Sequence, residues 1–163
     1  MHSHNHCCDH DHCEHKGHNH SHSQHHVEEA LEILKEAGYK HTNKRQRLVE
    51  ILNDANRYLS AKQVQELIAP EFPQLSYDTI YRNLYTFVQL NILEETELNG
   101  EKLFRFRCQN HGHHHHFICE KCGSTREIDM CPMDFFKDQL EGCEIHSHRF
   151  EIFGLCEKCA AKA

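Results

Sequence analysis

The chain has 163 residues, enough for one domain of ordinary size or two small ones. Its formal net charge is −7 at pH 7, so it lacks the basic composition of many nucleic-acid-binding proteins. It has no apolar run of about 18 residues and no apolar segment of the kind that signal peptides carry at the N-terminus. We therefore expect no transmembrane helix and a cytoplasmic protein, whose ten cysteines are better explained as metal ligands than as disulfides.

Residues 1–26 form a low-complexity segment with eleven histidines and three cysteines. The segment contains no Leu, Ile, Val or Phe, so it cannot contribute to a hydrophobic core. Histidines that alternate with Ser, Asn or Asp bind metals loosely, because any few imidazoles can converge on an ion. We expect a tail that is disordered without metal and that either buffers metal or has no specific role.

Four helices are expected between residues 27 and 90. The first covers 27–37 and stops at Gly38, and Thr42 caps the second. The third begins with the capping box SAKQ at Ser60–Gln63, and Ser76 caps the fourth at 76–90. The positions expected to face the core are Leu48, Ile51, Leu52, Ala55, Val64, Leu67, Ile68, Ile80, Leu84, Phe87 and Val88.

The segment ILEETELNGEKLFRFRC, at 92–108, predicts a β-hairpin. Asn99-Gly100 is a strong hairpin signal, and the flanking residues alternate as they do in strands. Helices followed by a hairpin indicate a winged helix-turn-helix, with helix 76–90 in the major groove of DNA. Lys102, Arg105 and Arg107 in the wing are suited to phosphate contacts. The alternative is a helical domain with an unrelated hairpin and solvated side chains.

Two CEKC motifs, Cys119–Cys122 and Cys156–Cys159, occupy the C-terminal third. Two such pairs can hold one zinc ion in a closed tetrahedron, which is typical of structural sites. Their separation predicts a small domain between them, with strands at HHFIC, STREIDM and CEIHSHRFEIFGLC. The segment PMDFFKDQLEG predicts a helix that buries Phe135, Phe136 and Leu140. The alternative is that each motif is a separate redox-active cysteine pair, but a redox role would not explain why the two motifs occur as a matched pair.

The tract HGHHHHFICEKCG, at 111–123, places four consecutive histidines before the first cysteine pair. Side chains alternate between the faces of a strand, so His113 and His115 point one way and His114 and His116 the other. One tract can therefore serve two metal sites. Solvated surface imidazoles are the alternative.

The segments LSYDTIYRNL, LFRFRC, HHHHFICEKCG and HRFEIFGLCEKC, in this order, resemble the ferric-uptake-regulator (Fur) superfamily of bacterial metal-sensing repressors. The resemblance covers residues from about 27 to 159, and the zinc uptake regulators are the most similar members. It implies an α+β fold, with an N-terminal winged helix-turn-helix domain at 27–107 and a C-terminal α/β dimerisation domain with a four-cysteine zinc site at 108–163. It also implies a zinc-loaded homodimer that binds double-stranded operator DNA and represses zinc-uptake genes.

The resemblance assigns roles to particular residues. The structural zinc ligands are Cys119, Cys122, Cys156 and Cys159. A regulatory hinge site resembles Cys108, His114 and His116 with one ligand from the DNA-binding half, for which we choose Glu94 over Glu95, Glu97 and Glu127. A second regulatory site resembles His113, His115, Asp134 and His148. Tyr81 and Arg82 match the family's DNA-contacting segment, and Ser76, Tyr77 and Thr79 are further candidates.

The choice of zinc rests on Cys108, because thiolates favour Zn²⁺ over the harder Fe²⁺ and Mn²⁺. Family members that sense iron, manganese, nickel or peroxide are the closest alternatives. A zinc store or metallochaperone is an alternative of another class, but it leaves the winged helix without a purpose. We expect no enzyme, since no HExxH motif occurs, and neither a membrane nor a small-molecule substrate as partner. Cys131 and Cys143 are interpreted as ordinary thiols.

Overall fold

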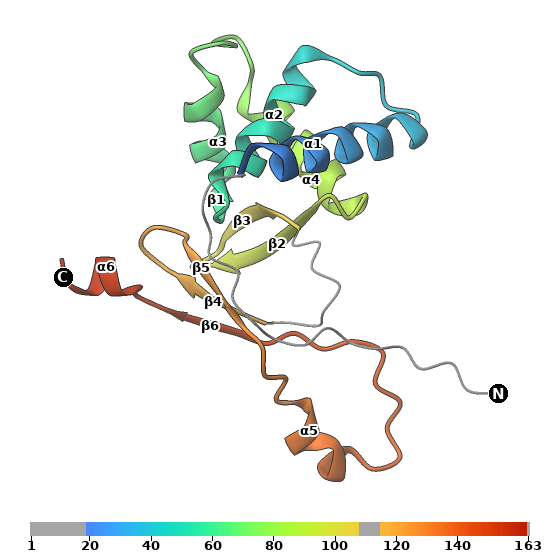
Figure 1. The fold of residues 1–163 in the computed structure, drawn as a ribbon, viewed down its shortest axis with the longest axis vertical. Helices are drawn as coiled ribbons and strands as arrows, with labels where there is room; N and C mark the ends of the chain where they lie inside the picture. The colour runs from blue at the N-terminus through green and yellow to red at the C-terminus, as the bar shows by residue number, and fades with distance from the viewer. Residues whose placement is uncertain (1–18, 108–114, 163) are drawn as a thin grey trace.

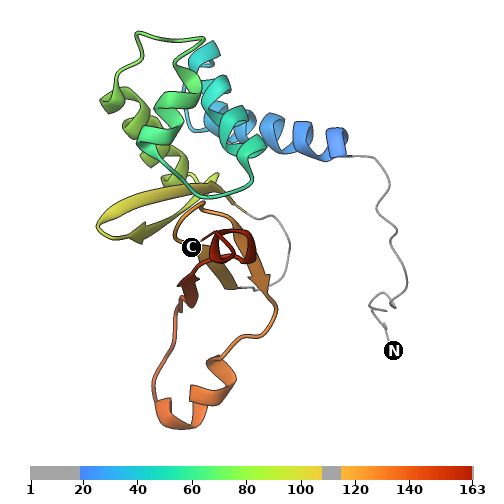
Figure 2. The same cartoon turned by 90° about the vertical axis from the view of Figure 1, so that its left-hand side faces the viewer.

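A computed structural model describes residues 19–107 and 115–162, and it places four helices at one end of the molecule (Figure 1). These are α1 (Asn19–Glu36), α2 (Asn43–Ala55), α3 (Ala61–Ile68) and α4 (Tyr77–Gln89). A first sheet lies beneath the helices, a second sheet lies beneath the first, and α5 lies beyond the second sheet (Figure 2). The N-terminal part of the chain therefore forms the helices and the first sheet, and the C-terminal part forms the second sheet and α5.

The helices begin at the expected capping residues. The Thr42 side chain accepts a hydrogen bond from the backbone of Arg45, and the Ser76 side chain accepts one from Thr79. Ser60 and Gln63 form the complete capping box. The first helix differs from the expectation because it begins at Asn19 rather than 27. No Gly or Pro interrupts residues 19–36, so the end of the histidine-rich segment can continue the helix.

The core of the helical half is formed by the apolar faces of all four helices. Ala55 and Val88 pack against it while half-buried, and Phe104 of the wing is fully buried in it. The expectation that Leu67 is buried was wrong, because α3 packs through Val64 and Ile68 and leaves Leu67 47% exposed. The buried residues that were expected are Leu48, Ile51, Leu52, Val64, Ile68, Ile80, Leu84 and Phe87.

The first sheet is the wing. It contains β1 (Leu59–Ser60), β2 (Leu93–Leu98) and β3 (Glu101–Phe106) in the order β1-β3-β2, and all neighbours are antiparallel. Asn99 and Gly100 have φ of 53° and 80°, as a two-residue type I′ hairpin requires. The predicted hairpin and winged helix are therefore confirmed.

The second sheet contains β4 (His115–Cys119), β5 (Thr125–Ile128) and β6 (Glu151–Gly154) in the order β5-β4-β6. The central strand β4 is antiparallel to β5 and parallel to β6. The remaining elements are α5 (Met133–Phe136), a 3-10 turn at Lys137–Leu140 and α6 (Glu157–Ala160). Within the part of the chain described, no helix is both long and apolar enough to cross a bilayer.

Two expectations for this half were wrong. The last strand is only four residues long, because residues 143–150 have no regular structure. The helix predicted to bury Phe135, Phe136 and Leu140 leaves all three exposed, since no part of residues 19–107 and 115–162 packs over it.

Candidate metal sites and DNA-binding surface

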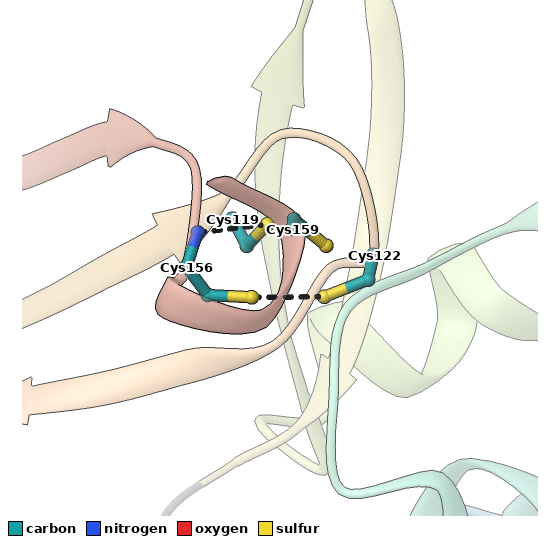
Figure 3. A group of neighbouring side chains, drawn as sticks. All are labelled: Cys119, Cys122, Cys156 and Cys159. Carbon is teal, nitrogen blue, oxygen red and sulfur yellow. Dashed lines mark hydrogen bonds between the residues drawn. The ribbon is translucent and has the colours of Figure 1, made fainter. Parts of the chain in front are cut away.

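Four cysteine side chains converge where the turn after β4 meets the start of α6 (Figure 3). All four Sγ atoms lie within 4.8 Å of one another, and those of Cys122 and Cys156 are 3.8 Å apart. A tetrahedron with Zn–S bonds of about 2.3 Å has sulfur–sulfur edges of about 3.8 Å. The cluster of Cys119, Cys122, Cys156 and Cys159 is thus confirmed as a group, and its dimensions fit one metal ion.

The four thiols do not ionise equally. Burial raises the pKa of Cys119, but hydrogen bonds from the backbone of Cys156, Cys122 and Lys121 outweigh burial and lower this pKa to about 6. The backbone of Cys159 likewise lowers the pKa of Cys156. The neighbouring Cys156 sulfur, by its hydrogen bond, raises the pKa of Cys159 to about 12. The chain alone can therefore ionise part of the cluster near neutral pH, and a bound cation is needed to displace the other protons.

The turn that carries Cys122 also contacts the helical half. Arg57 Nη1 donates to the carbonyl of Cys122 at 3.1 Å, and the backbone N–H of Tyr58 donates to the carbonyl of Gly123 at 3.0 Å. Gly123 has a φ of +71°, and a Cβ at this position would lie 2.3 Å from the carbonyl oxygen of Tyr58. Glycine is therefore required here, and the cysteine cluster is hydrogen-bonded directly to the segment between α2 and β1.

A buried guanidinium lies where the wing meets the second sheet. Arg105 Nη1 is 3.2 Å from Nε2 of His116 and 3.5 Å from Oε1 of Glu94, and both His116 and Arg105 are only 7% exposed. The hydroxyl of Tyr58 donates to the same Glu94 oxygen at 3.2 Å. Burial, and then the charge of Glu94, raise the pKa of Tyr58, so this hydroxyl keeps its proton. The expectation that Arg105 contacts phosphate was wrong, because its side chain is buried against the other half.

The structure thus brings two predicted hinge ligands, Glu94 and His116, to a single arginine. Cys108 and His114 lie outside the described residues. Three other carboxylates were alternatives to Glu94 as the fourth hinge ligand. Glu95 forms an ion pair with Lys102 at 2.8 Å. Glu97 is in register with the same lysine on the hairpin. The third rival, Glu127, is in register with His116 across the second sheet.

Glu151 is a neighbour of His116 that the sequence did not single out. It is in register with His116 from the other side of β4. Its carboxylate accepts hydrogen bonds from Thr96 at 2.9 Å and from Arg149 at 2.8 Å. Only the parallel pairing of β4 with β6 reveals this position, and no local motif encodes that pairing. Glu151 links the wing to the second sheet through Thr96.

Replacing Glu94 by glutamine is expected to lower the free energy of unfolding by about 1–3 kcal/mol, because it leaves Arg105 buried beside a neutral partner. Urea denaturation measures this loss. The matched control is Glu95→Gln, whose partner Lys102 is partly solvated, and which we expect to cost less than about 1 kcal/mol. Equal losses for the two variants would contradict the importance of the buried pair.

Three ligating side chains gather on the opposite face of β4. His115 is 4% exposed, and its ring centroid lies 5.3 Å from that of His148. The Sγ atom of Cys131 lies 3.3 Å from Nε2 of His148, and the ligand atoms of all three residues lie within 4.8 Å of one another. His115 and His148 of the predicted second site are therefore brought together. His113 and the side chain of Asp134 lie outside the described part of the chain, and Cys131 was not expected here.

The recognition helix presents its candidate residues unequally. Ser76 and Thr79 bond to each other at the helix cap, with their hydroxyl oxygens 2.9 Å apart. Tyr81 is half-buried with its ring edge-on to Phe104. Tyr77 is well exposed, and Arg82 is exposed with only a solvated contact to Asp78 at 3.0 Å. The candidates Ser76, Tyr77, Thr79 and Arg82 are therefore all exposed, and only Tyr81 is half-buried.

Comparison with known proteins agrees with this architecture. The model of the ferric uptake regulator family matches residues 36–153. A ferric uptake regulation protein from Staphylococcus epidermidis is 47% identical over 135 residues, which cover 83% of this chain and 96% of the relative. One from Staphylococcus aureus is 49% identical over 131 residues, which cover 80% and 96%.

Two solved structures share the fold. The ferric uptake regulator of Helicobacter pylori, described as having three functional metal-binding sites, has a TM-score of 0.66 at 20% identity and covers 85% of this chain and 93% of its own. A zinc uptake regulator complexed with zinc and DNA has a TM-score of 0.64 at 20% identity and covers 86% and 96%. At this identity the two structures support the fold alone.

A winged helix joined to a sheet domain with cysteine and histidine clusters defines a metal-responsive transcriptional regulator. The chain belongs to the ferric uptake regulator family. The expected closer similarity to zinc uptake regulators is not confirmed, because the curated relatives described above are named for iron.

Proposed function

We propose that the protein is a zinc-responsive repressor that binds operator DNA as a homodimer in the cytoplasm and controls zinc-uptake genes. The position of His116 carries the metal dependence, because this buried imidazole of the second sheet reaches Glu94 of the wing through one guanidinium. Ligands from both halves can fix the orientation of one half on the other. The preference for zinc rests on the thiol of Cys108, a soft ligand at the end of the wing.

In this mechanism the chain's own residues set the angle of the winged helix. A bound Zn²⁺ supplies a divalent charge and short bonds to thiolate, imidazole and carboxylate donors. Cys108 and Glu94 on the wing side would be held with His114 and His116 on the sheet side. The α4 helices of a dimer would then keep the spacing of about 34–36 Å that successive major grooves demand. A coupling of about 1–3 kcal/mol for each binding event is typical of such switches.

Exposed apolar side chains of the C-terminal half support the dimer. They lie around α5 and on β6, where Ile152 and Phe153 point to opposite faces of the second sheet, and apolar side chains that gather in one part of an isolated chain commonly mark a protein interface. A closed homodimer would cover the same side chains on both copies and give the two-fold symmetry of a palindromic operator. These exposed apolar residues are Met130, Phe135, Phe136, Leu140, Ile145, Phe150, Ile152, Phe153 and Leu155.

The test is DNA binding under buffered metal, read by fluorescence anisotropy on a palindromic operator. Protein that holds only its four-cysteine metal is titrated with free Zn²⁺, Fe²⁺, Mn²⁺ and Ni²⁺ in separate series. We expect tight binding at the lowest free concentration with zinc, and loss of that binding in Cys108→Ala. Cys143→Ala, the same change at an exposed cysteine outside the clusters, serves as the control.

Iron sensing is the second candidate, because the Staphylococcus relatives are named ferric uptake regulation proteins. The same titration separates the two candidates. Binding driven by Fe²⁺ below the effective zinc range, and indifferent to Cys108→Ala, would replace the zinc proposal with an iron sensor. Metal uptake without DNA binding in any series would instead favour a zinc store.

A further inference from the structure

We propose that Cys131 is a metal ligand and that, with His115 and His148, it forms a sulfur–nitrogen metal site on the face of β4 opposite His116. The three residues come from separate segments: β4, the loop after β5 and the loop before β6. Their ligand atoms nevertheless lie within 4.8 Å of one another. Convergence of three ligating side chains from distant segments is the arrangement that a metal site requires.

The donor geometry is close to that of a metal complex. In a tetrahedral site with metal–sulfur bonds of about 2.3 Å and metal–nitrogen bonds of about 2.0–2.1 Å, sulfur and nitrogen lie about 3.5 Å apart. Cys131 Sγ and His148 Nε2 are 3.3 Å apart. The pair can therefore change from a hydrogen bond to shared coordination with only a small movement.

One donor is buried on the central strand, the second lies directly before a helical turn, and the third is exposed to solvent. His115 lies on the central strand of its sheet, and its ring stands edge-on to Phe150 with centroids 5.5 Å apart. Pro132 follows Cys131 and begins a helical turn, with its carbonyl accepting a hydrogen bond from the backbone of Phe135 at 3.0 Å. His148 is exposed. An ion can therefore reach the site from solvent through His148 and meet the buried imidazole of His115.

The thiolate changes which metal the site prefers. Two imidazoles and a thiolate form a softer donor set than imidazoles and carboxylates alone, so they favour Zn²⁺ over Fe²⁺ and Mn²⁺. This site deepens the proposed zinc function, but its existence can be tested without DNA.

The test is cobalt absorption. Protein with zinc in the four-cysteine site is titrated with Co²⁺, and the thiolate-to-cobalt charge-transfer band is recorded for wild type, Cys108→Ser, Cys131→Ser and the double variant. We expect each single variant to keep part of the band and the double variant to lose it. The double variant also reports any exchange of cobalt into the four-cysteine site.

Zinc competition completes the test. Cys131→Ser is expected to weaken zinc binding at this site by about tenfold or more, because even second-shell changes cost metal sites tenfold to a hundredfold. His148→Gln, at an exposed position, should weaken it similarly without disturbing the fold, and Cys143→Ser should change nothing. A Cys108→Ser protein that binds cobalt without any charge-transfer band would overturn the proposal. Failure of zinc to drive DNA binding would overturn the proposed function but leave this site standing.

Discussion

Replacing Cys119 by serine is expected to remove one bound metal per chain and to unfold the C-terminal half. Structural zinc contributes about 10–16 kcal/mol of apparent binding free energy in small zinc-dependent peptides. That is comparable with the whole stability of an ordinary domain, about 5–15 kcal/mol. The second sheet has three short strands and exposes several of its apolar side chains, so it has little core of its own to replace the metal. Metal content and circular dichroism melting measure the two effects.

The control for this variant is Cys143→Ser, because Cys143 is exposed and lies outside both ligand clusters. It should keep the metal content and the melting temperature of the wild type. If Cys119→Ser also kept both, the four-cysteine cluster would not be a structural metal site. Because Cys122 and Gly123 accept hydrogen bonds from Arg57 and Tyr58, we also expect Cys119→Ser to lower the melting temperature of the helical half.

Replacing Arg82 by alanine is expected to weaken operator binding by about tenfold or more without changing the fold. A single base or phosphate contact typically contributes about 1–3 kcal/mol, and a dimer would lose two such contacts. The side chain is exposed and its contact to Asp78 is solvated, so the loss of that contact costs little stability. Anisotropy titrations at saturating metal measure the affinity.

Arg126→Ala supplies the matched control, because Arg126 is an exposed arginine of the second sheet, far from α4. Both variants remove one positive charge, so a general electrostatic effect would weaken them equally. A specific role for Arg82 predicts that only its variant loses affinity. The salt dependence of the affinity distinguishes a phosphate contact from a base contact. Loss of a phosphate contact lowers the slope of log affinity against log salt concentration by about one for each contact.

Local chemistry made most of the fold predictable. Helix caps and tight turns depend on only three or four neighbouring residues, so a short stretch of sequence is enough to predict them. This holds for the caps at positions 42, 60 and 76 and for the Asn99-Gly100 turn. The paired CEKC motifs were also recognisable, because the chemistry of thiolates restricts what two such pairs can do. These features were confirmed.

Features that depend on distant partners were missed. From the sequence, Arg105 was expected to face outward from the wing. It is buried instead, because the second sheet lies against the wing at this position. Cys131 has no motif of its own, and its contact with His148 depends on how the short loop before α5 and the longer loop before β6 meet. The aromatic residues of α5 were expected in a core that a single chain does not provide.

Arg105 has a consequence for any ion that enters the hinge. If Glu94 and His116 are ligands, the guanidinium of Arg105 competes with the ion for both of them. Binding of a divalent ion would then replace the single positive charge of the guanidinium by two, and the guanidinium would have to leave its buried position. Arg105 would therefore act as a built-in competitor of the metal ion at the hinge. An ion is retained only when it binds these two side chains more strongly than the chain's own arginine does.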